Sequence, residues 1–255
     1  MITPLRNLAQ RLVRPAPAAA SVPAGERVYA VGDIHGRLDL LDNLLAQIDA
    51  DDAARPPART TIVFLGDLVD RGPESKGVVQ RLLDLSRKGR DCRFLKGNHE
   101  EVFVEAAAGE EQAARMLVRM GGRATALSYG IPESEYAGLS FAALAERLAV
   151  LVPPEHRRFL DAFEPTVRIG DYLFVHAGIR PGVSIEEQSW EDLCWMRNPF
   201  LSHKGSFGPM VVHGHTVTPE VDERPNRIGI DTGAYRSGRL TAIGLEGEAR
   251  WYLST

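Results

Sequence analysis

The chain has 255 residues, of which 44% are hydrophobic, and its 30 basic and 34 acidic residues give a net charge of -4 at pH 7. A chain of this length can bury one substantial core, so a single folded domain is the default expectation. The near balance of positive and negative charge argues against nucleic acid as a partner.

The cysteines fit a reducing compartment. Cys92 and Cys194 are the two cysteines, and they lack the spacing of a zinc site or a redox pair. We expect both to serve in packing. The sequence contains neither an apolar run of the length that a membrane span needs nor an N-terminal leader pattern, so we expect a cytoplasmic protein.

The first 25 residues differ in composition from the rest. They carry Arg6, Arg11 and Arg14, followed by a stretch rich in proline and alanine. We predict a flexible tail or linker here, with residues 26–255 forming the domain. A helix lying on a membrane surface is the alternative, but the segment is short and interrupted by proline.

Short runs of β-branched and aromatic residues begin at Arg27, and each ends abruptly in Gly, Asp, His or Asn. Such runs predict buried strands. They cover residues 28–31, 61–65, 92–95, 172–175, 210–212 and 227–230. Apolar residues at helical spacing fill the first two gaps, at positions 38–48 and 78–85, and Gly89 closes the second. Alternating strands and helices predict an α/β fold with parallel crossovers.

Two further segments complete the predicted layout. Residues 101–165 contain no strong strand signal and hold alanine-rich, charge-studded stretches, so we predict a helical insert. Near the end of the chain, residues 240–245 and 249–253 flank Glu246-Gly247-Glu248 and predict a β-hairpin.

Reactive side chains follow five of the predicted strands. In an open α/β sheet, ligands bind beyond the carboxyl ends of the strands. Five of the seven histidines lie in these loops, and only His156 and His203 lie elsewhere. One such loop alone would usually be a turn or a helix cap, but five together predict a shared site. The loops read GDIHG (32–36), GDLVDRG (66–72), GNHE (97–100), HAG (176–178) and HGHT (213–216).

The residue types in these loops favour a metal centre. Imidazole, carboxylate and neutral amide oxygen suit divalent manganese, iron, zinc or cobalt, whereas the lack of thiolates argues against structural zinc. Two ions joined by a shared carboxylate can lower the pKa of a bridging water and brace an in-line displacement at phosphorus.

In this order, the five motifs resemble the signature blocks of the phosphoprotein phosphatase family of calcineurin-like metallophosphoesterases, in its bacterial serine/threonine phosphatase type. The resemblance covers residues 32–233. It implies a β-sandwich of two mixed sheets flanked by helices. Because the helical insert at residues 101–165 directly follows GNHE, we expect it to cap the cleft and to determine specificity. It also implies two divalent cations; we expect manganese, with iron, zinc, cobalt or magnesium as alternatives.

The resemblance also implies the metal ligands. Asp33 and His35 would bind the first metal, and Asp67 would bridge both. The ligands of the second metal would be Asn98, His176 and His215. His213 is the alternative to His215, and otherwise has a structural role.

The remaining roles concern the phosphoryl group. By the same resemblance His99 would be the general acid, oriented by Asp70, in a reaction where a metal-bridging hydroxide attacks in line. Arg71 and Arg197 would grip the phosphoryl oxygens, because a guanidinium can donate to two oxygens at once. Asp231 would either support the metal ligands or cap a turn.

Four functions are consistent with these features. The first is a stand-alone protein phosphatase acting on phosphoserine, phosphothreonine or phosphotyrosine, and the second is a nucleotide hydrolase of the diadenosine tetraphosphate type. The third is a phosphomonoesterase or phosphodiesterase acting on small metabolites. The fourth, a non-catalytic binding module, is disfavoured because every expected ligand and acid position is filled.

Overall fold

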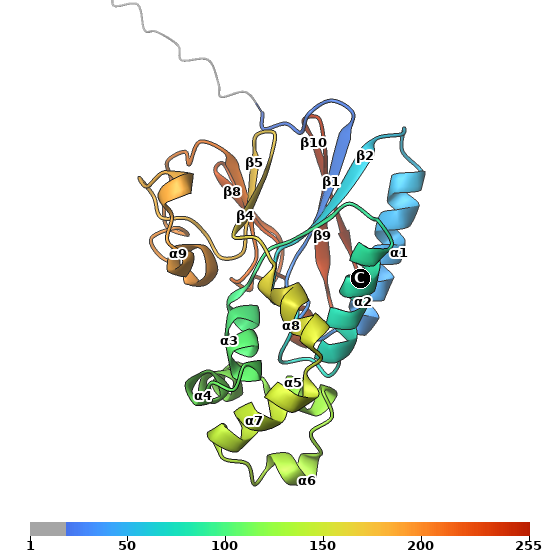
Figure 1. Cartoon of the computed structure of the whole chain (residues 1–255). Helices are drawn as coiled ribbons and strands as arrows, with labels where there is room; N and C mark the ends of the chain where they lie inside the picture. The colour runs from blue at the N-terminus through green and yellow to red at the C-terminus, as the bar shows by residue number, and fades with distance from the viewer. Residues whose placement is uncertain (1–18) are drawn as a thin grey trace, which may run out of the picture.

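The computed structural model describes residues 19–255, so most of the predicted tail, including Arg6, Arg11 and Arg14, lies outside the described residues. The described chain forms two five-stranded sheets, ordered β10-β9-β1-β2-β3 and β4-β5-β6-β8-β7. The two sheets stand side by side in Figure 1.

The first sheet begins with the predicted strand–helix–strand–helix–strand pattern. Strands β1, β2 and β3 are parallel, and a C-terminal hairpin of β9 and β10 adds antiparallel to β1. Helices α1 and α2 form the crossovers. The bounds are β1 Glu26–Val31, α1 Leu38–Ala53, β2 Arg59–Phe64, α2 Ser75–Arg87, β3 Cys92–Phe94, β9 Thr241–Glu246 and β10 Ala249–Ser254.

The second sheet is mixed. Its three central strands β5, β6 and β8 are parallel, whereas the edge strands β4 and β7 are antiparallel to their neighbours. The bounds are β4 Thr166–Ile169, β5 Tyr172–Val175, β6 Met210–His213, β7 Asp222–Arg224 and β8 Arg227–Gly229, with the short helices η1 Ile185–Glu187, α9 Trp190–Trp195 and α10 Ala234–Ser237. The edge strands β4 and β7 were not predicted.

Side chains along β1 alternate between two apolar layers of the protein. Val28 and Ala30 belong to the apolar cluster between the sheets, whereas Tyr29 and Val31 belong to the cluster under α1 and α2. Successive strand residues point to opposite faces, so one strand serves both layers. A third cluster, containing Leu193 of α9, covers the outer face of the second sheet. The predicted class, two mixed sheets flanked by helices, is confirmed.

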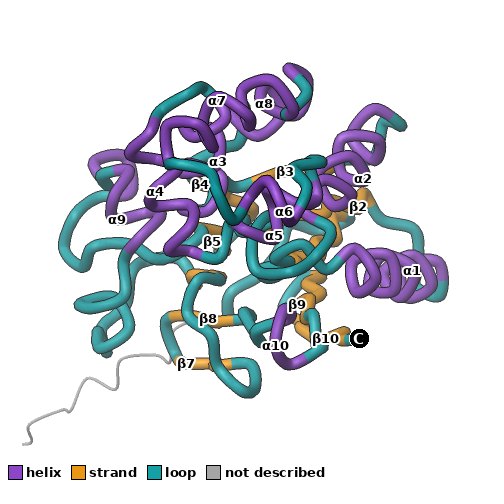
Figure 2. The backbone as a smooth tube through the Cα atoms, turned by 90° about the horizontal axis from the view of Figure 1, so that it is seen from below, coloured by secondary structure: helices purple, strands orange, loops and turns teal. Residues whose placement is uncertain are grey.

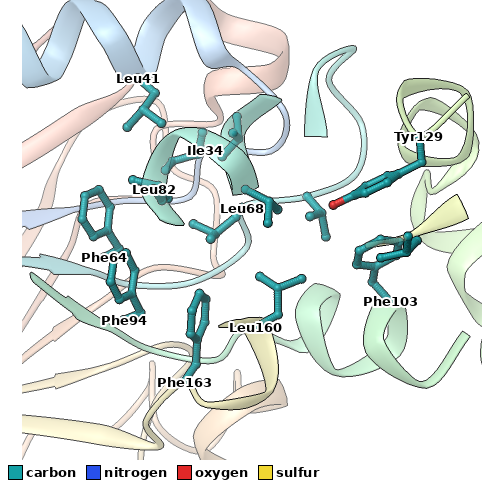
Figure 3. Close-up of a cluster of buried hydrophobic side chains, with 14 of the residues drawn as sticks. Ile34, Leu41, Phe64, Leu68, Leu82, Phe94, Phe103, Tyr129, Leu160 and Phe163 are labelled. Carbon is teal, nitrogen blue, oxygen red and sulfur yellow. The ribbon is translucent and has the colours of Figure 1, made fainter. Parts of the chain in front are cut away.

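Six helices lie between β3 and β4 and gather below the strands in Figure 1; Figure 2 views the molecule from that side. They are α3 Asn98–Ala107, α4 Glu111–Met120, α5 Arg123–Ser128, α6 Glu133–Tyr136, α7 Phe141–Leu151 and α8 Pro154–Asp161. Figure 3 shows that Phe103 of α3, Tyr129 just after α5 and Leu160 of α8 join Phe64 and Leu82 in one buried cluster. Across residues 19–255, every helix is too short or too polar to traverse a bilayer.

Candidate metal centre

The five predicted loops meet at the carboxyl ends of β1, β2, β3, β5 and β6. Backbone hydrogen bonds join them across the sheets: the His35 N–H donates to Asp67 O at 2.8 Å, and the Gly214 N–H donates to His176 O at 2.9 Å. Side chains that are distant in the sequence are therefore presented from one connected set of loops.

The backbone of these loops is strained. Among the described residues, five that are not glycine have left-handed φ values, and all five lie in this region: His35, Asp67, Asp70, Arg71 and His215. Left-handed backbone is unfavourable for residues with a Cβ atom, and such strain concentrates at functional sites. The surrounding hydrogen bonds must hold these conformations.

Backbone carbonyls orient two of the histidines. The Nδ1–H of His35 donates to Val69 O at 2.8 Å, and that of His176 donates to Leu65 O at 2.8 Å. The lone pair of Nε2 in each ring therefore faces the centre of the site. Burial lowers the pKa of His35 to about 3 and also lowers the pKa of His176, so both rings are neutral and able to bind a cation at neutral pH.

Asp67 lies between two groups of donors. Its Oδ2 is 3.6 Å from Nε2 of His35, and its Oδ1 is 3.4 Å from Nε2 of His176. Atoms of His35, Asp67 and His99 lie within 4.8 Å of one another, and so do atoms of Asp67, His176 and His215. Because Asp67 belongs to both groups, its carboxylate is placed to bridge two cations.

Asn98 lies against the two histidines of the second group, His176 and His215, and lone pairs that meet there repel one another unless a cation or a proton lies between them. Nε2 of His176 is 3.1 Å from Oδ1 of Asn98. Because Nδ1 of the same ring carries the proton and donates it to Leu65 O, Nε2 is an acceptor, as is the Asn98 oxygen. Nδ1 of His215 is 3.0 Å from the same Asn98 oxygen. Burial lowers the pKa of His215 to about 3, so its ring is neutral at neutral pH and one of its nitrogens has a lone pair to offer a cation. These three residues fit a divalent cation.

Buried atoms without partners mark the rest of the centre. Oδ1 of Asp33 and Nε2 of His35 are buried and have no hydrogen-bond partner among the described residues. Such atoms destabilise the fold unless something satisfies them, and a cation would do so. Burial, followed by the charges of Asp231 and Asp67, raises the pKa of Asp33 well above its usual value.

Asp33 stands outside both close donor groups, yet it is tied to the second one. Its Oδ2 accepts a hydrogen bond from the backbone N–H of His215 at 2.9 Å. A Cβ atom at Gly214 would lie 2.0 Å from Oδ1 of Asp33, so only glycine permits this approach. The donor set as a whole fits two divalent cations, and the ligand assignments made from the sequence stay predictions.

His99 faces the centre with one nitrogen and Asp70 with the other. Nδ1 is 2.7 Å from Oδ2 of Asp70, whereas Nε2 is 3.8 Å from Oδ2 of Asp67 and 3.1 Å from Nη2 of Arg71. Burial opposes a charged ring, but the carboxylates of Asp67 and Asp70 raise the pKa of His99 above its usual value. Because a guanidinium only donates, Nε2 accepts from Arg71 in this arrangement, and the two carboxylates favour a proton on Nε2 once Arg71 bonds to another acceptor.

A cleft of about 490 Å³ opens over these residues. Arg71, Arg119 and Arg197 line it together with the aromatic rings of Trp195 and Tyr235. Within residues 19–255, none of the three guanidinium groups has a carboxylate within 4.0 Å. They can therefore bind an anion without first breaking an ion pair.

Two predicted positions lie at the margin of the centre. His213 belongs to neither donor group; its ring packs edge-on against Phe200 with centroids 5.0 Å apart, and its Nδ1–H donates to Gly214 O. Oδ1 of Asp231 accepts from the Gly233 N–H at 2.9 Å, and its charge acts on Asp33. Asp231 thus caps a turn and also adjoins Asp33.

Several residues in or beside the site were not predicted from the sequence. The carboxylate of Glu100 accepts from the backbone N–H groups of Gly97, Asp67 and Leu68, which fixes the loop that carries Asp67. Its position three residues after the helix cap Gly97 is a capping-box signal that could have indicated this role. Tyr235, whose ring lies edge-on to His35 and beneath Arg71, gave no comparable local signal.

Comparisons with known proteins agree with this geometry. Residues 26–236 match the family described as calcineurin-like phosphoesterase. Serine/threonine-protein phosphatase 1 of Salmonella typhimurium is 29% identical over 86% of this chain and 92% of its own length. A symmetrical bis(5'-nucleosyl)-tetraphosphatase of an Acidovorax species is 30% identical over 63% of this chain, but the match spans only 47% of that relative.

Solved structures share the fold. A structure proposed to be a diadenosine tetraphosphatase has a TM-score of 0.63 and 25% identity, covering 92% of this chain and 98% of that one. A cold-active protein tyrosine phosphatase has a TM-score of 0.53 and 18% identity, covering 91% of this chain and 81% of that one, a likeness of fold alone.

Proposed function

The chain belongs to the calcineurin-like phosphoesterase family and is a phosphoric ester hydrolase, and from this premise we propose that it is a protein phosphatase acting on phosphoserine and phosphothreonine. The observation that carries the proposal is the buried His99–Asp70 pair beside Asp67. A serine or threonine side chain leaves as an alkoxide, which is a poor leaving group and needs a proton donor. The relative named serine/threonine-protein phosphatase 1, matched over nearly its whole length, supports the same proposal.

Six residues would hold the cations in this proposal. Asp33 and His35 would bind one cation, and Asp67 would bind both; the ligands of the other would be Asn98, His176 and His215. Bound there, two divalent cations supply a water of lowered pKa and draw negative charge from the phosphoryl oxygens.

The chain's own side chains would do the rest. Arg71 and Arg197 line the cleft, where each could donate to phosphoryl oxygens and turn the phosphorus toward the centre. His99 would hold a proton on Nε2 and give it to the leaving oxygen, while the bond from Nδ1–H to Asp70 keeps the ring in place.

A dinucleoside polyphosphate hydrolase is the second candidate. The observation in its favour is Arg119, a third guanidinium that lines the same cleft as Trp195 and Tyr235 and has no carboxylate within 4.0 Å among residues 19–255. A phosphate chain presents several anionic groups, and aromatic rings can stack on bases. The relatives named symmetrical tetraphosphatases are consistent with this candidate.

One experiment separates the two candidates. The purified chain, reconstituted with manganese, is given phosphoserine peptides and diadenosine tetraphosphate at equal concentrations. The proposal predicts a higher kcat/KM for the phosphopeptides. Preference for the dinucleotide would replace it with the second candidate, and hydrolysis of neither in a metal-loaded sample would leave small phosphate esters as the substrates.

A further inference from the structure

Thr125 reaches Asp70 from the helices between β3 and β4. It lies in α5, Arg123–Ser128, and is fully buried. Its Oγ1 is 2.5 Å from Oδ1 of Asp70, 2.9 Å from the Asp70 backbone nitrogen and 2.9 Å from Oγ of Ser75. This hydroxyl is thus the direct contact between α5 and the His99–Asp70 pair.

The direction of these hydrogen bonds follows from the groups available. The carboxylate of Asp70 only accepts, so the single proton of the Thr125 hydroxyl is donated to Oδ1. Thr125 then accepts from the Asp70 N–H and from Ser75. Because the other carboxylate oxygen, Oδ2, accepts from Nδ1–H of His99, Thr125 determines how this second oxygen is aimed.

The contact also secures a strained segment. Asp70 and Arg71 have φ values of 72° and 66°, in the left-handed region that residues other than glycine rarely adopt. The Asp70 N–H donates a hydrogen bond to the hydroxyl oxygens of Thr125 and Ser75. The Arg71 N–H donates to the carbonyl oxygen of Gly121 at 3.1 Å. The segment from Gly121 to Thr125 therefore holds both residues from outside their own loop.

We propose that Thr125 is a positioning residue for the proton donor: its hydroxyl fixes the Asp70 carboxylate, which fixes the His99 ring. The inference rests on the proposed role of His99 in protonating the leaving group. In this proposal α5, one of the six helices between β3 and β4, affects acid catalysis through Thr125. Thr125 does so without contacting the residues that would bind the cations.

The test uses leaving groups rather than the physiological substrate. Phenyl phosphate and p-nitrophenyl phosphate differ in how much the departing phenolate needs a proton, so loss of the donor harms phenyl phosphate more. Thr125→Val keeps the shape of the side chain and removes the hydroxyl, whereas Thr125→Ser keeps the hydroxyl. Activity on these two esters does not depend on whether the natural substrate is a phosphopeptide or a dinucleotide.

Thr125→Val should lower kcat for phenyl phosphate by roughly 10- to 100-fold and for p-nitrophenyl phosphate by less than about 3-fold, given the usual size of acid catalysis. KM and metal content should not change, and Thr125→Ser should restore most of the loss. The control is Ser128→Ala, which removes a hydroxyl on the same helix that bonds to Thr125 O and the Lys76 N–H instead of Asp70.

Equal losses on both esters, a leaving-group effect of the same size in Ser128→Ala, or no rescue by Thr125→Ser would overturn the proposal. Failure of the wild-type protein to hydrolyse phosphopeptides would contradict the protein phosphatase proposal alone, since both esters still report on Thr125.

Discussion

Nδ1 of His99 lies 2.7 Å from Oδ2 of Asp70, and both side chains are buried. The bond fixes the tautomer of the ring and leaves Nε2 as the nitrogen that faces the cleft. His99→Asn should therefore lower kcat on a phosphoserine peptide by roughly 10²–10⁴, the usual contribution of a general acid. Steady-state kinetics with elemental analysis of the same sample would check this. Normal turnover at full metal content would exclude His99 as the donor.

Asp67→Asn should reduce the bound metal from two ions per chain to fewer than one. Each oxygen of Asp67 faces a different histidine, and an amide offers one oxygen and no charge to hold both cations. Elemental analysis after desalting is the measurement. Asp39→Asn, which alters an exposed carboxylate paired with Arg37, is the control and should keep both ions. Two ions retained in Asp67→Asn would contradict the bridging role.

Arg119→Ala tests the second candidate function. Removing one charge-assisted contact to a polyphosphate should raise KM for diadenosine tetraphosphate about 10-fold, equivalent to about 1.4 kcal/mol, and change KM for a phosphopeptide less than about 2-fold. The control is Arg115→Ala, one turn earlier on α4, where the guanidinium already faces Glu111 at 3.7 Å. Equal effects on both substrates would remove Arg119 as a basis for the dinucleotide candidate.

His213 predicts a pH dependence of stability. Burial lowers its pKa from 6.5 to about 4, so the folded state keeps the ring neutral while the unfolded state protonates it below pH 6.5. The unfolded state then binds the extra proton, and stability is lost as pH falls from 6.5 toward 4. At pH 5 the loss is about 2 kcal/mol, from 1.36 kcal/mol for each pH unit below 6.5.

The matched variant is His213→Phe in metal-free protein. Urea unfolding at pH 7.5 and pH 5 should show the wild type losing about 2 kcal/mol more than the variant over this interval. The other buried histidines titrate in both proteins, so the difference isolates His213. An identical pH dependence in the two proteins would show that the folded state does not hold this ring neutral.

The parts of the fold that followed from the sequence are those with local causes. Strands such as β1 and β5 are short apolar runs that end in turn residues, and their carboxyl ends carry the motifs. The edge strands β4 and β7 did not follow, because residues such as Arg168 and Glu223 are exposed and break the apolar pattern. Their pairing is determined by neighbouring strands rather than by their own composition.

The residues of the site also fall into those with a local sequence signal and those without one. The loops after the strands could be recognised because each motif is contiguous in the sequence. Thr125 could not, because its role depends on α5 folding back onto a loop 55 residues earlier in the chain. Arg119 and Tyr235 likewise reach the cleft only through tertiary packing. No local pattern distinguishes such residues from ordinary members of a helix.

The helices around the cleft share a buried apolar cluster with the first sheet, which limits how substrate preference could change in this protein (Figure 3). Phe103, Tyr129 and Leu160 fill the same apolar interior as Phe64 and Leu82, so cutting out the helices around the cleft would expose the flank of the first sheet to water. A new substrate preference would therefore have to arise from single substitutions of residues that line the cleft, such as Arg119, rather than from replacement of the whole helical segment.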